Sequence, residues 1–193
     1  LGDVYKRQIR AVLGRVSAAI YGNPSYDVPV IGITGTSGKT TTSYLIESAF
    51  RTAGHSVGMI GTTGSRINGV RVPSSLTTPE ASDLQRLFAT MRDDGVHRIV
   101  MEVSSHSLLL GRVGGTRFRI GAFLNLSQDH LDFHHTMEEY FQAKARLFTK
   151  DSGTCCDRAV ICIDDSWGLR MRDIAEASGC TPVTVSTTCL LYT

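Results

Sequence analysis

The 193-residue sequence predicts an α/β domain with a mostly parallel sheet and helices on its flanks. Short runs rich in β-branched residues alternate along the chain with longer segments of helical periodicity, which is typical of parallel strands joined by helices. The apolar content of 41% is ordinary for a globular domain, and no apolar run is long enough to span a bilayer.

The strands are expected where apolar, β-branched runs are bounded by turn residues. These runs are 28–34, 57–60, 99–103, 120–126, 159–163 and 183–185. Between the second and third of them, Asn68-Gly69 inside 66–73 indicates a hairpin or turn.

The helices are expected where apolar residues recur every three to four positions. The first contains Ile9 to Ile20 and ends at Gly22, before Asn23-Pro24. In the second, one apolar face is formed by Leu45, Ile46, Ala49, Phe50 and Ala53, with Gly54 as its C-terminal cap.

Three later helices have start signals or periodic patterns of their own. Thr78-Pro79-Glu80 reads as a helix start with Thr as the cap and Pro at the first position. Thr136-Met137-Glu138-Glu139 is a capping box, and the last helix is expected over 167–177. We expect 1–24 to be a flanking helix, 25–188 the domain, and 189–193 a tail; segments 1–8 and 189–193 lack periodicity and need not be native to it.

Charge and cysteine content restrict the partners. A net charge of +2 is too small to imply nucleic acid or membrane as a partner, so small molecules are expected. The first ten residues are mixed and charged, unlike a signal peptide, and the five cysteines form no C-x-x-C pair. We therefore expect a cytoplasmic monomer with reduced thiols and no zinc site.

A glycine loop follows the first strand and opens the second helix. Its residues are Gly35, Thr36, Ser37, Gly38, Lys39, Thr40 and Thr41. Backbone N–H groups of such a loop bind phosphate oxygens, Lys39 brings positive charge to the β- and γ-phosphates, and the Thr40 hydroxyl ligates Mg²⁺. This predicts an ATP site on a P-loop NTPase-like sheet. The general pattern requires glycine at position 33, where Ile33 stands, so an ordinary strand-turn-helix is the alternative.

Four spaced segments together resemble the Mur ligase family, whose ATP loop also lacks that outer glycine. They are 34–42, Leu76-Thr77-Thr78-Pro79-Glu80, 101–106 (Met-Glu-Val-Ser-Ser-His) and 125–134 (Asn-Leu-Ser-Gln-Asp-His-Leu-Asp-Phe-His). The chain looks most similar to the member that adds the third residue of the stem peptide, and the resemblance covers only the central domain of such a protein. The resemblance implies that the family's N-terminal uridine-binding domain and C-terminal amino-acid-binding domain are not part of this sequence.

The resemblance implies an ATP-dependent amide-bond ligase of peptidoglycan precursor synthesis, within cell-wall biogenesis, cell shape and cell division. The substrate UDP-N-acetylmuramoyl-L-Ala-D-Glu would be activated as an acyl phosphate and joined to meso-diaminopimelate or L-lysine. As catalytic residues it implies Lys39, Lys144 and His130. We expect this chain alone to be inactive.

Glu102 is a candidate metal ligand because of its position at the C-terminal end of a predicted buried strand, where the ligands of parallel sheets bind. The resemblance assigns Thr40 and Glu102 to a first Mg²⁺, and His130 to a second. Alternatively Glu102 is a solvated strand-end carboxylate. Loop histidines are usually solvated, which we expect of His134 and His135, and His134 is a candidate ligand only after His130.

Lys144 lies on an apolar helix face, four residues after Tyr140. A lysine there normally extends its ammonium to water. If it stays inside, desolvation lowers its pKa and leaves a neutral amine that can react with CO₂. The resemblance implies a carbamate, derived from CO₂, on Lys144 that positions the second Mg²⁺.

On the substrate side, the resemblance places Thr77, Thr78, Ser104 and Arg112 on the UDP-sugar. For the two threonines, helix capping is the alternative. Leu110, Leu124 and Gln128 depart from the residues expected in the motifs, which leaves the contact at 110 in doubt.

Three rival functions remain. One is a related ligase, such as folylpolyglutamate synthetase or a Mur ligase of another step, against which Ser104-Ser105-His106 and Thr77-Thr78-Pro79 argue. Another is a nucleotide-binding module without catalysis. The third, a small-molecule kinase, needs an arginine-rich lid that is not visible in the sequence.

Overall fold

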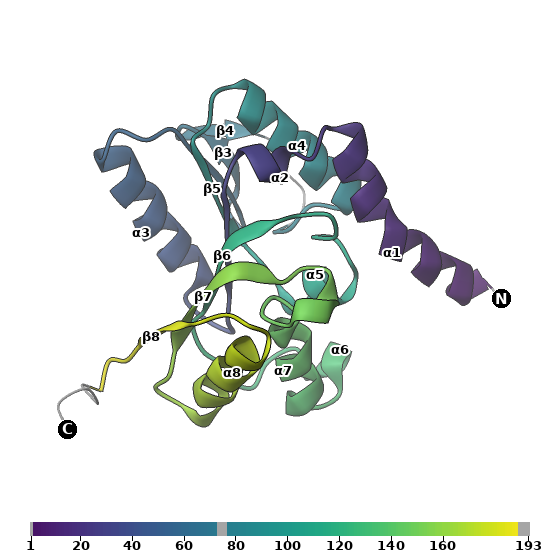
Figure 1. The fold of residues 1–193 in the computed structure, drawn as a ribbon, viewed down its shortest axis with the longest axis vertical. Coiled ribbons are helices and arrows are strands. Elements are labelled where there is room, and N and C mark those ends of the chain that lie inside the picture. Colours follow the sequence, from purple (N-terminus) through teal and green to yellow (C-terminus); the bar gives the residue numbers. More distant parts are fainter. Residues whose placement is uncertain (1, 73–76, 189–193) are drawn as a thin grey trace.

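The computed structural model describes residues 2–72 and 77–188. Its eight strands form one sheet in the order β4-β3-β2-β5-β1-β6-β7-β8, with helices on both faces (Figure 1). The neighbouring strands in the run β2-β5-β1-β6-β7-β8 are all parallel, and the antiparallel pairs β2–β3 and β3–β4 form one edge. The predicted α/β fold with a mostly parallel sheet is therefore confirmed.

The strands have the following bounds: β1 Val30–Thr34, β2 Val57–Gly61, β3 Gly64–Ile67, β4 Val70–Val72, β5 Arg98–Glu102, β6 Phe118–Phe123, β7 Cys156–Cys162 and β8 Val183–Val185. The helices are α1 Gly2–Ile20, α2 Pro24–Asp27, α3 Lys39–Thr52, α4 Ala81–Asp93, α5 Ser105–Leu109, α6 Leu131–His134, α7 Met137–Ala145 and α8 Ser166–Ala177, with a short 3-10 turn over Lys150–Ser152. Every expected strand is present within a few residues of its predicted bounds. Asn68-Gly69 joins β3 to β4; Pro73, Leu76 and the tail 189–193 lie outside the described residues.

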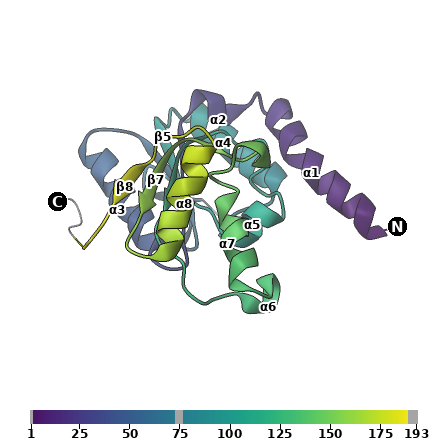
Figure 2. The same cartoon turned by 60° about the horizontal axis from the view of Figure 1, so that its bottom comes forward.

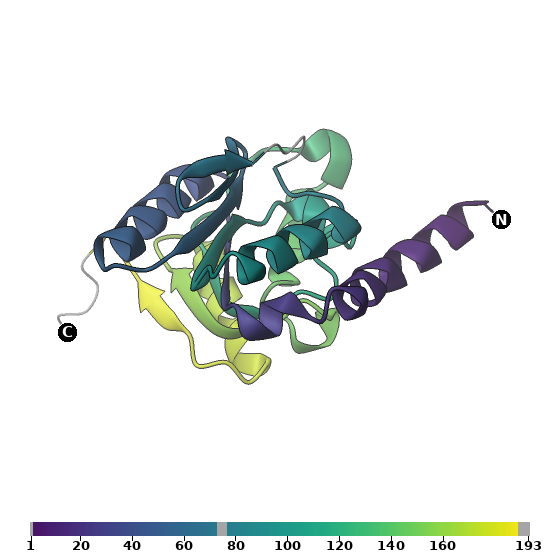
Figure 3. The ribbon, with the colours of Figure 1, turned by 90° about the horizontal axis from the view of Figure 1, so that it is seen from above.

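Two apolar clusters cover the two faces of the sheet. The larger one joins the sheet to α4, α7 and α8 through buried side chains such as Phe88, Phe141 and Met171. The smaller one lies under α3, where Ile46 and Phe50 pack on it. Figures 1 and 3 show α3 alone on its side of the sheet, opposite α4. Because β1 lies between β5 and β6, the loops after these three strands open at one edge of the domain, where ligands of open parallel sheets bind.

The predicted apolar face of α3 is wrong in part. Leu45, Ala49 and Ala53 are exposed, whereas Ser43 and Glu47 are buried. The Ser43 hydroxyl is satisfied by donating to the Lys39 carbonyl at 2.8 Å, so a polar residue can occupy the buried side of this helix.

The predicted start of α4 is also wrong. The helix begins at Ala81 with Glu80 in the cap position, and Thr78 does not cap it. The Thr78 side chain instead donates a hydrogen bond to the Glu102 carbonyl at 3.1 Å, in a buried position. The Thr78 hydroxyl therefore binds a carbonyl at the end of β5 in place of the first turn of α4.

Helix α1 extends from the body of the domain, and its N-terminal half projects away from the other elements (Figures 1 and 2). The helix and its end before Gly22 were predicted. No helix among the described residues is both long and apolar enough to cross a membrane. The proposed boundaries at 24 and 188 remain predictions.

Candidate active site

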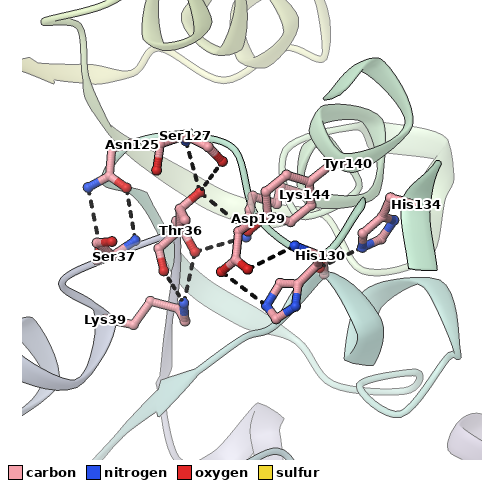
Figure 4. A network of polar contacts seen from close by, with 12 residues as sticks. Thr36, Ser37, Lys39, Asn125, Ser127, Asp129, His130, His134, Tyr140 and Lys144 are labelled. Atoms are coloured by element: carbon pink, nitrogen blue, oxygen red, sulfur yellow. Dashed lines mark hydrogen bonds and ion pairs between the residues drawn. The ribbon is translucent and has the colours of Figure 1, made fainter. Parts of the chain in front are cut away.

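The glycine loop lies between β1 and α3, as predicted. Gly38 caps α3 with φ of 84°, a left-handed conformation that glycine adopts without strain. The loop is fastened to the segment after β6: the Thr36 amide donates to the Asn125 carbonyl at 3.1 Å, and the Ser37 amide to Asn125 Oδ1 at 3.0 Å. Figure 4 shows the two hydrogen bonds between Ser37 and Asn125, and beside them the two between the Thr36 hydroxyl and the Ser127 backbone. The loop is thereby held in one conformation at the N-terminus of α3, where anions bind.

Two lysines converge on a single carbonyl of this loop. Lys39 Nζ donates to the Gly35 oxygen at 2.9 Å and to the Thr36 oxygen at 2.9 Å. Lys144 Nζ, reaching across from α7, donates to the same Gly35 oxygen at 2.8 Å. Burial lowers the pKa of Lys39, while the carboxylates of Glu102 and Asp129 oppose that change. The site therefore concentrates positive charge where triphosphate oxygens would lie.

Lys144 is held inside the domain, which settles the alternatives for its side chain. Only 1% of the residue is exposed, and its Nζ lies 4.5 Å from the centre of the Tyr140 ring. Burial first, and then the nearby Lys39 charge, lower the pKa of Lys144 to about 7, against an opposing effect of Asp129. In a substantial fraction of the molecules, the Lys144 side chain is thus a neutral amine near pH 7.

This buried lysine should make stability depend on pH. Between pH 7 and 10.5 the unfolded chain keeps the Lys144 proton that the folded chain has lost, so the free energy of unfolding rises with pH across that window. The expected slope from this group is at most about 1.4 kcal/mol per pH unit. A Lys144→Met variant should lack that component in denaturant titrations at pH 7 and 9, while Lys150→Met, at an exposed lysine, should keep it. Equal slopes in all three proteins would contradict the assignment.

Glu102 ends β5 next to the glycine loop and is 1% exposed, so it is not a solvated strand-end residue. Its Oε1 accepts from the Thr40 hydroxyl at 2.9 Å and from the Thr62 amide at 3.0 Å, and its Oε2 accepts from the Thr62 hydroxyl at 3.1 Å. The carboxylate is therefore fixed beside the predicted Thr40 ligand.

These oxygen donors fit Mg²⁺. Hydroxyl and carboxylate oxygens are its preferred ligands, and it usually takes one or two from the protein and the rest from water and phosphate. Within residues 2–72 and 77–188, no group of three or more His, Cys, Asp or Glu side chains is arranged to hold an ion. A magnesium ion at Thr40 and Glu102 would take its other ligands from water and phosphate.

Gly61 makes the Glu102 position possible. A Cβ on Gly61 would meet Glu102 Oε1 at 2.3 Å, far inside contact distance. We expect Gly61→Ala to push the carboxylate away from Thr40 and to lower ADP formation by the full-length protein about 10-fold or more, since small displacements at a reacting centre cost that much. Steady-state assays over a range of Mg²⁺ concentrations would measure it. Gly61 is not among the glycines at positive φ, so alanine is compatible with its backbone and the expected loss comes from the clash with the carboxylate.

The histidines are arranged differently from one another. His130 is 47% exposed in its side chain, at the N-terminus of α6, with Nε2 3.5 Å from Asp129 Oδ2. His134 is 2% exposed, and its Nε2 bonds Ser105 Oγ at 2.8 Å, so the expectation that it is solvated is wrong. Burial, with nearby His106 and Lys144, lowers the pKa of His134 to about 4, so it is neutral at pH 7. His134 anchors α6, and His130 remains available as a ligand (Figure 4).

The predicted substrate residues lie near the end of β5. Arg112 Nε lies 2.9 Å from Glu80 Oε1, which orients the guanidinium. Ser104 caps α5, its Oγ accepting from the Ser107 amide at 3.1 Å. Thr77 is half-buried, and the Thr78 hydroxyl is used as described above. The structure therefore gathers these residues, while giving Thr78 and Ser104 roles within the fold.

Two residues of the site were missed from sequence. Thr62 follows β2 at the same edge as Glu102, and the strand-end rule that identified Glu102 would also have identified Thr62. Tyr140 Oη lies 3.3 Å from Thr36 Oγ1, and its ring lies between the glycine loop and the histidines. Its apolar spacing in α7 signalled only a core residue.

The described cysteines are all free thiols, as predicted: Cys155, Cys156, Cys162 and Cys180. Burial raises the pKa of Cys155 to about 11, so this thiol is un-ionised near pH 7. Cys189 lies outside the described residues.

Known proteins share both the sequence and the fold. Residues 33–189 match the family described as Mur ligase middle domain. A UDP-N-acetylmuramoyl-L-alanyl-D-glutamate--2,6-diaminopimelate ligase of Corynebacterium glutamicum is 63% identical over 167 residues, which are 86% of this chain and 32% of that protein. The chain thus spans about a third of the length of such relatives.

Solved structures agree with this match. A structure of UDP-N-acetylmuramoyl-L-alanyl-D-glutamate--2,6-diaminopimelate ligase superposes with a TM-score of 0.75 at 32% identity, covering 92% of this chain and 36% of the other. E. coli FolC in complex with DHPP and ADP superposes with a TM-score of 0.67 at 20% identity, covering 91% and 46%. The second likeness is one of fold alone.

Proposed function

This chain belongs to the Mur ligase family, and from that membership we propose that it is the ATP-binding part of a longer ligase that joins 2,6-diaminopimelate to UDP-N-acetylmuramoyl-L-Ala-D-Glu. The observation that carries the proposal is the convergence of Lys39 and Lys144 on one loop carbonyl beside the Thr40–Glu102 pair. The 63% identical relative has the corresponding name, which favours diaminopimelate over lysine. The chain itself, 25–188 above all, would bind nucleotide without completing the reaction.

We propose that ATP binds with its phosphates on Gly35 to Thr41. Loop amides and the N-terminus of α3 would hold the phosphate oxygens, and Lys39 would turn from the loop carbonyls to the β- and γ-phosphates. Thr40 and Glu102 would hold a Mg²⁺, which neutralises charge on the transferring phosphoryl group when bound. Thr62 and Gly61 keep the Glu102 carboxylate in place for that role.

We propose that Lys144 is carbamylated in the working enzyme. Its neutral amine would add to CO₂, forming an N–C bond and releasing one proton, and the group would become an anion. A buried amine with a pKa of about 7 is suited to that addition, because the neutral form is the nucleophile. The repulsion between Lys39 and Lys144 would become an attraction. The new carboxylate and His130, which both lie beside Tyr140, would then be two ligands for a second Mg²⁺.

The reaction would proceed by attack of the substrate's terminal carboxylate on the γ-phosphate, giving an acyl phosphate and ADP. The amine of diaminopimelate would then displace phosphate and form the amide. Thr77, Thr78, Ser104 and Arg112 are proposed to face the UDP-sugar, with Arg112 pairing with one of its anionic groups. The amino-acid and uridine sites would lie in parts of the longer protein beyond this chain.

Product analysis tests the choice of substrate. The full-length protein would be given ATP and UDP-N-acetylmuramoyl-L-Ala-D-Glu with either meso-diaminopimelate or L-lysine, and products would be identified by mass. We expect the diaminopimelate product to dominate by at least tenfold in kcat/KM. If the full-length protein instead extends a folate, or accepts only UDP-N-acetylmuramoyl-L-Ala, it is a different ligase of this fold and the proposal is wrong.

A further inference from the structure

Helix α1 carries an apolar stripe that faces solvent. Its large hydrophobic residues are unusually exposed: Ile9 by 57%, Val12 by 54%, Val16 by 51% and Ile20 by 74%. At about 100° per residue these positions share one side of the helix, within a sector of roughly 80°. A continuous aliphatic stripe of this kind on the surface of a protein is often a functional surface.

The opposite side of α1 is already used by the domain. A Cβ on Gly14 would meet the Gly114 carbonyl oxygen at 2.3 Å, so helix and loop are in backbone contact there. Ser17 and Ala18 are buried on that side as well, toward α4 and the 111–116 loop. The helix is therefore fixed in orientation, and it cannot rotate the stripe inward. Figures 1 and 3 show nothing of the domain beside the outer side of α1.

We propose that this stripe is the docking face for the part of the full-length protein that precedes α1. The inference rests on the multi-domain organisation proposed above. The chain spans about a third of the length of its relatives, and α1 lies before residue 33, where the match to the family domain begins. A domain that precedes α1 in the longer protein would adjoin the stripe, and an apolar face on that domain would cover it.

The size of the stripe favours an intramolecular partner over a second copy. Four half-exposed aliphatic side chains offer on the order of 300 Å² of apolar surface. Stable association of separate proteins buries about 800 Å² on each partner. A domain tethered directly to α1 is present at a high effective concentration, so a smaller contact suffices to hold it. The contact would set the position of the preceding domain relative to the glycine loop.

Thiol labelling of the full-length protein tests the proposal. Val16→Cys places a thiol on the stripe, and Arg15→Cys places one on the next position of the same turn, exposed but pointing about 100° away. With iodoacetamide and site-resolved mass spectrometry, we expect Val16→Cys to react at least 10-fold more slowly than Arg15→Cys. The protection should not change on dilution of the protein.

Equal labelling rates at the two positions would overturn the proposal, and so would protection that disappears on dilution, because that result identifies a second copy. Unfolding temperatures of both variants would show whether α1 remains folded; Val12→Cys repeats the test if Val16→Cys is unstable. The ligation assay is run on the same samples. Slow labelling of Val16→Cys without ligation activity would support the docking face and contradict the proposed function. Fast labelling with normal ligation activity would contradict the docking face and support the proposed function.

Discussion

Replacing Lys39 with alanine in the full-length protein should lower kcat for ADP formation by about 10²- to 10³-fold, the usual loss when one preorganised charge at a phosphoryl-transfer site is removed. The ammonium already lies beside the loop, on the Gly35 and Thr36 carbonyls at 2.9 Å each, so it has only to turn from them to reach phosphate. Stopped assays at saturating ATP and Mg²⁺ would measure the change.

The matched control is Lys150→Ala, which removes an exposed lysine from the 3-10 turn and should leave kcat within twofold of the parent protein. Lys39→Arg should not restore activity, because a planar guanidinium cannot occupy the position of a compact ammonium between two carbonyls. Full activity of the alanine variant would show that the triphosphate lies elsewhere.

Replacing Lys144 with alanine should also reduce ligation by at least about 10²-fold, through loss of a ligand and of a fixed charge near the reacting phosphate. ATP binding should weaken much less, because the loop stays fastened through Asn125. The substitution leaves space on the Tyr140 ring where a small carboxylate can bind. Formate or acetate at millimolar concentrations should therefore restore part of the activity by replacing the proposed carbamate.

The rescue distinguishes a carbamate from a simple ammonium. If activity is lost and short carboxylic acids do not restore it, whereas methylamine does, Lys144 acts as a cation and the carbamate proposal is wrong. Lys39→Ala serves as the control here, since carboxylic acids should not restore a site that lacks a cation. Mass spectrometry is a poor substitute, because carbamates dissociate during analysis.

Sequence alone predicted the sheet and the glycine loop because both rest on local patterns. Apolar β-branched runs mark buried strands, and Gly38-Lys39-Thr40 has a local geometry of its own. The wrong predictions concern side chains whose partners are distant in the sequence. Thr78 was expected to cap α4, but a buried partner at the end of β5 binds its hydroxyl. His134 was expected in solvent, but Ser105, 29 residues earlier, holds it inside.

In the candidate active site too, local features could be predicted from sequence and contacts between distant segments could not. The strand-end position of Glu102 could be read from sequence, but its bonds to Thr62 could not, because they depend on how β2 and β5 align. For Lys144 the sequence left two outcomes open, extension to water or burial. Only the packing of α7 against the loop decides between them, and it places the amine on the Gly35 carbonyl.

The central claim is that the glycine loop of this chain serves a ligase that activates a carboxylate of a cell-wall precursor. The most direct test is ADP formation by the full-length protein with ATP and Mg²⁺, in the presence or absence of UDP-N-acetylmuramoyl-L-Ala-D-Glu. We expect ADP to form only with that substrate, and phosphate to appear in equal amount once diaminopimelate is added. ADP formation at the same rate without the precursor would contradict the claim.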